Sequence, residues 1–146
     1  MSLALANVGY QSVALLPATV ITTAVTNLTG PVVTGLLGMQ VLTCQAALTY
    51  GSGGTNVTAY VQTTFDGGVT WVDIVCFQFT TATARAINSV RSAAIVTANY
   101  TPTDGSLAAN TIKDGLLGDQ LRVKYTSTGT YAGNTTLSVT AVAKGA

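Results

Sequence analysis

The sequence predicts an all-β protein, an antiparallel β-sandwich or jelly roll with an extended N-terminal arm. Thr is the commonest residue and Val is abundant, and both favour strands because branching at Cβ packs well on a pleated sheet. Glu is absent and Lys and Arg together number only 6, so residues typical of helices are scarce. Apolar and polar residues alternate over several stretches, which Gly-rich turn signals separate at regular spacing.

Four segments alternate with a period of two, as strands with one buried and one wet face do. They are residues 41–50, 57–65, 121–126 and 136–144. This pattern indicates antiparallel sheets. Residues 69–79 are apolar on both faces, which predicts a central strand or one whose outer face is covered. Further strands are predicted at residues 92–100, 81–88, 19–25 and 31–37.

A single domain is predicted, with residues 1–30 as an N-terminal arm and first short strand and residues 31–146 as one β-sandwich. The apolar segment 3–25 lacks the basic region of a secretory signal and is interrupted by polar residues and Pro17. We therefore expect neither a signal peptide nor a spanning helix, and we expect synthesis in a cytoplasm. The arm is interpreted as contacting a partner through Leu3, Leu5, Val8, Tyr10, Leu15 and Leu16.

The charge content is low and uneven. Charged residues make up 8% of the chain, about a third of the usual share, and none precedes Asp66. A free monomer usually spreads charge over its surface, so the neutral segment favours a surface covered by a partner. A soluble surface rich in Thr, Ser, Asn and Gln is the alternative. The net charge of +1 without a basic run argues against binding to nucleic acid or to an anionic membrane.

The residues that usually carry catalysis are missing or have simpler roles. The chain has no His, which excludes Ser-His-Asp and Cys-His arrangements. Each of its five Asp residues is interpreted as a turn former or a surface charge. Cys44 and Cys76 form no CxxC motif, so we expect no metal site, and two buried free thiols are favoured over a disulfide. The sequence predicts a protein that is not an enzyme and needs no cofactor.

One local motif stands out at residues 64–71. Its Thr64, Asp66, Gly68, Thr70 and Trp71 occupy the positions of an Asp-box, which this stretch resembles. The resemblance implies a β-hairpin turn in which the Asp side chain binds turn amides and the Trp packs beneath. A sialidase-like propeller would repeat the motif in every blade, whereas this chain has it once and is too short for several blades. We therefore interpret it as a structural hairpin.

The whole chain resembles the small β-rich virion structural proteins of tailed bacteriophages, of the head decoration or cement type. The features that carry the resemblance are the neutral N-terminal arm, the segment 65–74, and the alternating 137–142 that leads to Lys144-Gly145-Ala146. The resemblance implies a non-enzymatic protein that binds the capsid lattice as a homo-oligomer and stabilises the phage head. Its implied partners are the major capsid protein or other virion proteins, and its implied location is the virion, after synthesis in the host cytoplasm.

A second hypothesis is a carbohydrate- or receptor-binding β-sandwich module, in a head fibre or a tail component. Trp71, Tyr50, Tyr60 and Tyr131 are the aromatic residues that would offer a stacking platform for a sugar, although packing in the core explains them as easily. The sequence does not separate a head location from a tail location, and it does not indicate the symmetry of an oligomer.

Overall fold

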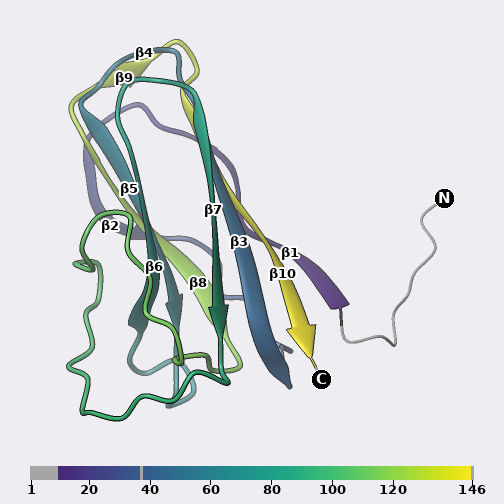
Figure 1. The fold of residues 1–146 in the computed structure, drawn as a ribbon. Coiled ribbons are helices and arrows are strands. Elements are labelled where there is room, and N and C mark those ends of the chain that lie inside the picture. The colour runs from purple at the N-terminus through teal and green to yellow at the C-terminus, as the bar shows by residue number, and fades with distance from the viewer. Residues whose placement is uncertain (1–9, 37, 146) are drawn as a thin grey trace, which may run out of the picture.

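The computed structural model describes residues 10–36 and 38–145, and strands make up the regular structure in this range. All of the strand pairings are antiparallel (Figure 1). The main strands are β1 (Tyr10–Val20), β2 (Val25–Thr29), β3 (Met39–Thr49), β5 (Asn56–Thr63), β6 (Val72–Phe79), β7 (Ala84–Arg91), β8 (Leu121–Thr128) and β10 (Thr136–Gly145). Two short strands, β4 (Ser52–Gly53) and β9 (Tyr131–Ala132), pair with each other. Within the described ranges, no helix is long and apolar enough to cross a membrane.

The main strands form two four-stranded sheets, with the orders β1-β10-β3-β7 and β2-β8-β5-β6. The chain changes sheet at every step between main strands except from β5 to β6, which form a hairpin within one sheet. Eight antiparallel strands interleaved in this way between two sheets make a jelly roll. The predicted class, an all-β antiparallel sandwich or jelly roll, is confirmed in its jelly-roll form.

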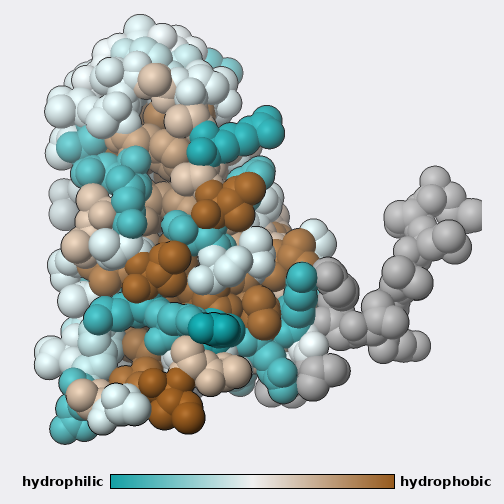
Figure 2. All heavy atoms as spheres, in the orientation of Figure 1, coloured by the Kyte–Doolittle hydropathy of each residue, from teal (hydrophilic) through white to brown (hydrophobic). Residues whose placement is uncertain are grey.

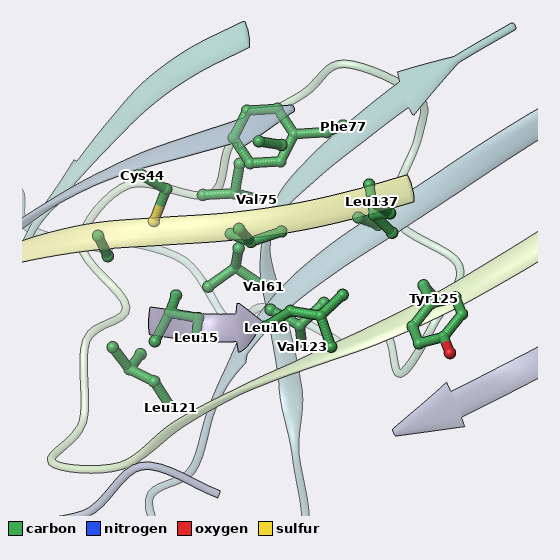
Figure 3. Close-up of a cluster of buried hydrophobic side chains, with 14 of the residues drawn as sticks. Leu15, Leu16, Cys44, Val61, Val75, Phe77, Leu121, Val123, Tyr125 and Leu137 are labelled. Atoms are coloured by element: carbon green, nitrogen blue, oxygen red, sulfur yellow. The ribbon is translucent and has the colours of Figure 1, made fainter. Parts of the chain in front are cut away.

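The core lies between the two sheets, where the inward-facing residues of each strand meet (Figure 3). Strand β3 shows the pattern: Leu42, Cys44 and Leu48 are fully or almost fully buried, while Thr43 and Gln45 between them are half-buried. Each fully buried Leu or Val side chain contributes about 1.5–3 kcal/mol relative to exposure. The alternation read from the sequence is therefore the alternation between core and outer face.

Strand β6 is buried on both faces, as its sequence predicts, although it lies at an edge of its sheet. The connection from β7 to β8, residues 92–120, runs along this edge and binds it through backbone hydrogen bonds. The Asp73 N–H donates to Thr103 O, the Cys76 N–H to Thr111 O, and the Lys113 N–H to Ile74 O, each at 2.8–2.9 Å. The connection therefore supplies the backbone partners that this edge strand would otherwise lack.

Some predicted strands are wrong. Residues 92–100 form turns and irregular structure at the start of the long connection, because the end of β7 turns away from the sheet there. The weaker segment 81–88 corresponds instead to β7. In the described part of the predicted strand 31–37, residues 31–36, there is an isolated bridge between Val33 and Leu121. Between residues 19 and 25 the chain ends β1 and begins β2. An alternating Thr-, Ala- and Val-rich segment forms a strand only where a neighbouring strand offers backbone partners.

The N-terminal region differs from the predicted arm. Strand β1 pairs with β10 along its length and β2 pairs with β8, so residues 10–20 and 25–29 belong to the two sheets. The interpretation of Leu15 and Leu16 as partner-contacting residues is corrected, because both point into the cluster between the sheets and are at most 3% exposed (Figure 3). Tyr10 begins β1 opposite Lys144. The remaining candidates, Leu3, Leu5 and Val8, lie outside the described residues.

Candidate interaction surfaces

Three long connections meet at one end of the jelly roll, which we call the long-loop end. They are residues 30–36 with 38, 64–71 and 92–120. They lie at the bottom of Figure 1, from where the last also runs up along β6. Hydrogen bonds join two of them to strand ends: the Gly118 N–H donates to Thr63 Oγ1 at the end of β5 at 2.9 Å, and Val33 pairs with Leu121 at the start of β8. The opposite end, the short-loop end, consists of residues 21–24, 50–55, 80–83 and 129–135.

Most of the exposed apolar side chains lie on the three long connections. Nine large hydrophobic residues are exposed in the described part of the chain, and six of them lie on the three long connections. These six are Val32, Phe65, Val69, Ile95, Val96 and Ile112. Val69 is 81% exposed and Ile95 is 86% exposed. Figure 2 shows apolar surface over the lower part of this face, whereas the upper tip is neutral to polar. Such an accumulation is typical of a surface that contacts another molecule.

The hairpin 64–71 presents two of these side chains from a tightly bonded turn. The Thr70 N–H donates to Asp66 Oδ1 at 2.8 Å, and the Thr70 hydroxyl donates to the other carboxylate oxygen. Thr64 Oγ1 donates to Asp66 Oδ1 at 2.9 Å and accepts from the Gly68 N–H at 3.0 Å. The Trp71 indole N–H closes the turn by donating to Gly68 O at 3.1 Å. All five residues of the predicted structural hairpin therefore lie in one hydrogen-bonded unit.

The same bonds set the chemistry of the hairpin. Hydrogen bonds from the Thr70 side chain and backbone, with a further one from Thr64, lower the pKa of Asp66 to about 2. The carboxylate is therefore charged at all ordinary pH values. The Trp71 ring is buried, with the Arg122 guanidinium 4.4 Å from its centroid. Phe65 and Val69, on either side of the turn, are 59% and 81% exposed, so a rigid turn holds two apolar side chains in solvent.

A buried carboxylate anchors the long connection beside this hairpin. Asp73 on β6 has no exposed surface. Its carboxylate accepts hydrogen bonds from the backbone N–H groups of Gly105, Ser106 and Leu107 at 2.8–3.1 Å. It also accepts from Gln62 Nε2 at 2.8 Å. A buried charge is tolerated only when it is paired or fully hydrogen-bonded, and these four donors meet that requirement.

A second layer of charged groups surrounds this anchor. Gln62 connects the two carboxylates, because its amide also donates to Asp104 at 2.6 Å and accepts from Arg122 Nε at 2.8 Å. Lys124 Nζ donates to Asp104. Partial burial disfavours ionisation of Asp104, but the hydrogen bonds from Lys124 and Gln62 outweigh it and hold its pKa below the ordinary value. The cluster fastens the 92–120 connection to the sheet.

Sequence reasoning missed Asp73, which is neither a turn former nor a surface charge. A signal was present, because an acidic residue within a strand that is apolar on both faces must be buried and therefore needs donors from outside that strand. What the sequence lacked was the position of those donors, about 30 residues along the chain at Gly105–Leu107. Asp114 likewise binds a group distant in sequence, since it accepts from the Arg91 N–H at 2.7 Å.

Cys44 and Cys76 are both buried free thiols. Burial raises the pKa of the Cys44 thiol to about 12, so it stays protonated. Burial likewise raises the pKa of Cys76. Among the described residues, no group of three or more Cys, Asp, Glu or His gathers in a way that could hold a metal ion.

The four aromatic residues considered for a stacking platform do not form one. Trp71 lies at the long-loop end and Tyr131 at the short-loop end, and both are buried. Tyr50 packs edge-on against Tyr131, with ring centroids 6.2 Å apart. Tyr60 is half-buried on β5. A sugar therefore cannot contact them as one surface.

No protein-family model matches the chain, and no curated protein matches it.

Proposed function

We propose that this protein is a non-enzymatic virion structural protein, a capsid decoration or cement protein that stabilises a phage head through contacts with copies of itself and with the major capsid protein. The observation that carries the proposal is the long-loop end, where a rigid hairpin and two other connections expose six large apolar side chains. A lattice-binding protein needs such a surface, because burying apolar area provides most of the free energy of stable association.

The distribution of chemistry in the fold supports the proposal. Asp66, Asp73, Asp104 and Asp114 each bind groups of their own chain, so these carboxylates have structural partners. The jelly roll is also the fold of many viral capsid domains, which is support by analogy of fold alone.

The test is cosedimentation of the purified protein with bare heads assembled from its cognate major capsid protein. We expect binding by the natural chain and at least a tenfold loss for the double variant Phe65→Ser, Val69→Ser, since each exposed anchor contributes at least about 1 kcal/mol when it is buried. The matched control is Val20→Ser, which removes a 51%-exposed valine at the end of β1 next to the short-loop end. Natural protein that stays in the supernatant at all concentrations contradicts the proposal.

The second candidate is a carbohydrate- or receptor-binding module of a head fibre or tail component. A depression of about 360 Å³ at the long-loop end, lined in part by Tyr100, Lys113 and Leu116, favours it. The Tyr100 hydroxyl is buried and has no hydrogen-bond partner among the described residues, so a ligand that opens this depression would supply one. Binding on a glycan array that Tyr100→Phe abolishes would favour this function over the first. An array without signal counts against it.

A further inference from the structure

The two sheets have four outer edges, and three of them are blunted. Edge strands present unpaired backbone groups that other chains can bind, so proteins usually cover or distort them. The 92–120 connection covers β6 through the backbone bonds described above. Strand β1 contains Pro17 and two register shifts. Strand β2 has only five residues, a register shift, and Asn27 with a φ of 52°.

The fourth edge, β7, has none of these devices over most of its length. Its eight residues pair with β3 in one unbroken register from Ala84 to Arg91. Among the residues that the structure describes, the backbone partners on this edge are at Arg91, whose N–H donates to Asp114 Oδ1 at 2.7 Å and whose carbonyl accepts from the Gly115 N–H at 2.9 Å. The chain thus covers β6 with a long connection that reaches β7 only at its end.

The directions of the other backbone N–H and C=O groups of β7 follow from its hydrogen-bond pattern with β3. In an antiparallel pair, successive residues direct their N–H and C=O groups alternately toward the partner strand and away from it. Ser92 donates to Gln40 O and Arg91 bonds the loop, so Arg91 faces away from β3. Ser89, Ile87 and Arg85 therefore also face away, and no described group hydrogen-bonds their backbone N–H or C=O. The Ile87 side chain is 63% exposed.

We propose that β7 pairs with β7 of a second copy of this chain, antiparallel about a two-fold axis at Ile87. This pairing joins the two β1-β10-β3-β7 sheets into one eight-stranded sheet across the dimer. The inference rests on the proposed function and identifies its homo-oligomeric contact.

The edge is self-complementary about this axis. The outward groups of Arg85, Ile87 and Ser89 are spaced two residues apart, so an antiparallel copy offers an acceptor to every donor and a donor to every acceptor. Ile87 lies opposite its own copy, and the two exposed side chains cover each other. Arg85 lies opposite Ser89 of the second copy, so the two arginines are not opposed across the pair.

The outer face around Ile87 also carries no charge that would oppose the approach of a second copy. The rows of the outer face next to Ile87 consist of small or neutral residues on all four strands. They are Ser12, Val142, Thr43 and Ser89 in one row and Ala14, Thr140, Gln45 and Ile87 in the next. A continuous sheet of two such faces brings no like charges together at its centre.

Sedimentation equilibrium on the full chain tests the pairing. A contact of this size buries less than about 1,200 Å², so we expect a monomer–dimer equilibrium at about 10–500 µM protein. Ile87→Lys and Ile87→Glu each place like charges opposite one another and should weaken dimerisation at least about tenfold. An equimolar mixture of the two variants should restore the dimer, because Lys then faces Glu. Misfolded variants would not be rescued in this way. The control Thr140→Lys, on the same face but two strands from the edge, should dimerise like the natural chain.

Several outcomes overturn the inference. A natural chain that stays monomeric over this range does so, as does a dimer that Ile87→Lys leaves unchanged. Association that requires residues 1–9 but not Ile87 would assign the contact to the N-terminal segment instead. Head binding is scored separately: a monomer that still binds heads overturns this inference alone, and a dimer that binds no heads overturns the proposed function alone.

Discussion

The two ends of the jelly roll are closed by different chemistry. At the short-loop end, the connections contain no charged residue, and Gly-rich turns bring the backbone segments into direct contact. Gly54 has a φ of 69°, and a Cβ there would lie 2.2 Å from the Tyr131 ring, so only glycine fits. The Tyr131 hydroxyl donates to Thr80 O at 3.1 Å and ties two turns together.

At the long-loop end, polar groups hold the connections while apolar groups face solvent. Asp66 and Asp73 bind backbone N–H groups of the turns, whereas Phe65 and Val69 are exposed. This reverses the usual assignment of apolar groups to the inside and polar groups to the outside. We therefore expect substitutions at the short-loop end to change only the free energy of unfolding. At the long-loop end, stability and association should be separable residue by residue.

The largest effect is expected at the short-loop end from Tyr131→Ala. The ring is 2% exposed and packs against Gly54 and Tyr50, so its removal leaves a cavity. We expect a loss of about 3–5 kcal/mol in the free energy of unfolding, measured by urea denaturation. Tyr131→Phe, which removes only the bond to Thr80, should cost about 1 kcal/mol. Equal losses for the two variants would contradict the packing role of the ring.

Asp73→Ala should have the next largest effect. It leaves the N–H groups of Gly105, Ser106 and Leu107 without their acceptor and frees the connection from β6. We expect a loss of about 3 kcal/mol, together with faster hydrogen exchange of the Cys76 amide, which the connection protects. The control Asp119→Ala alters an exposed carboxylate in the same connection and should change stability by less than about 0.5 kcal/mol. An unchanged exchange rate at Cys76 would mean that the anchor does not hold the edge.

A smaller effect, confined to the structure of the hairpin 64–71, is expected when the pH is lowered. The pKa of Asp66 is about 2 in the folded protein, against an ordinary value of about 4. A lowered pKa means that the charged form is the stabilised one, so its contribution is complete above about pH 4 and lost as the pH falls through about 2. Trp71 is the one tryptophan of the chain, and its fluorescence should report loosening of the turn in this window. In Asp66→Asn this transition should be absent, and identical acid titrations of the two proteins would contradict the role of the carboxylate.

The smallest effect on stability is expected for the exposed side chains of the same hairpin. Phe65→Ser and Val69→Ser remove groups that are largely in solvent already, so each should change the free energy of unfolding by less than about 0.5 kcal/mol. Urea denaturation of the double variant used in the head-binding test checks this. A loss above about 2 kcal/mol would show that these side chains support the fold, and reduced head binding could then reflect instability.

Local patterns predicted the parts of the fold that depend on neighbours in sequence. The alternation in 41–50 and 136–144 corresponds to β3 and β10, because the two faces of a strand differ only in burial. The hairpin 64–71 could also be predicted from the sequence, since all of its side-chain hydrogen bonds lie within eight residues. Only the contact of Trp71 with Arg122 reaches farther.

Contacts between residues that lie far apart along the chain could not be predicted from the sequence. Residues 92–100 alternate like a strand but have no partner strand, whereas 10–20 are less regular yet pair with β10 and bury Leu15 and Leu16. The neutral N-terminal segment suggested a surface covered by another molecule. For β1, much of that cover is the protein's own second sheet. The exposed apolar residues of the three long connections are scattered in sequence, and their exposure is decided only in the folded chain.

The sequence by itself determined which residues face inward on most strands, where the chain turns, and that the fold is all-β. A period of two marks the face of a strand, and it says nothing of which strand lies beside it. The tertiary structure alone decided the order of the strands, which donors bind Asp73, and which of the four edges is covered. These features depend on backbone groups that meet across 30 or more residues of chain, where loop closure rather than local preference selects the partner.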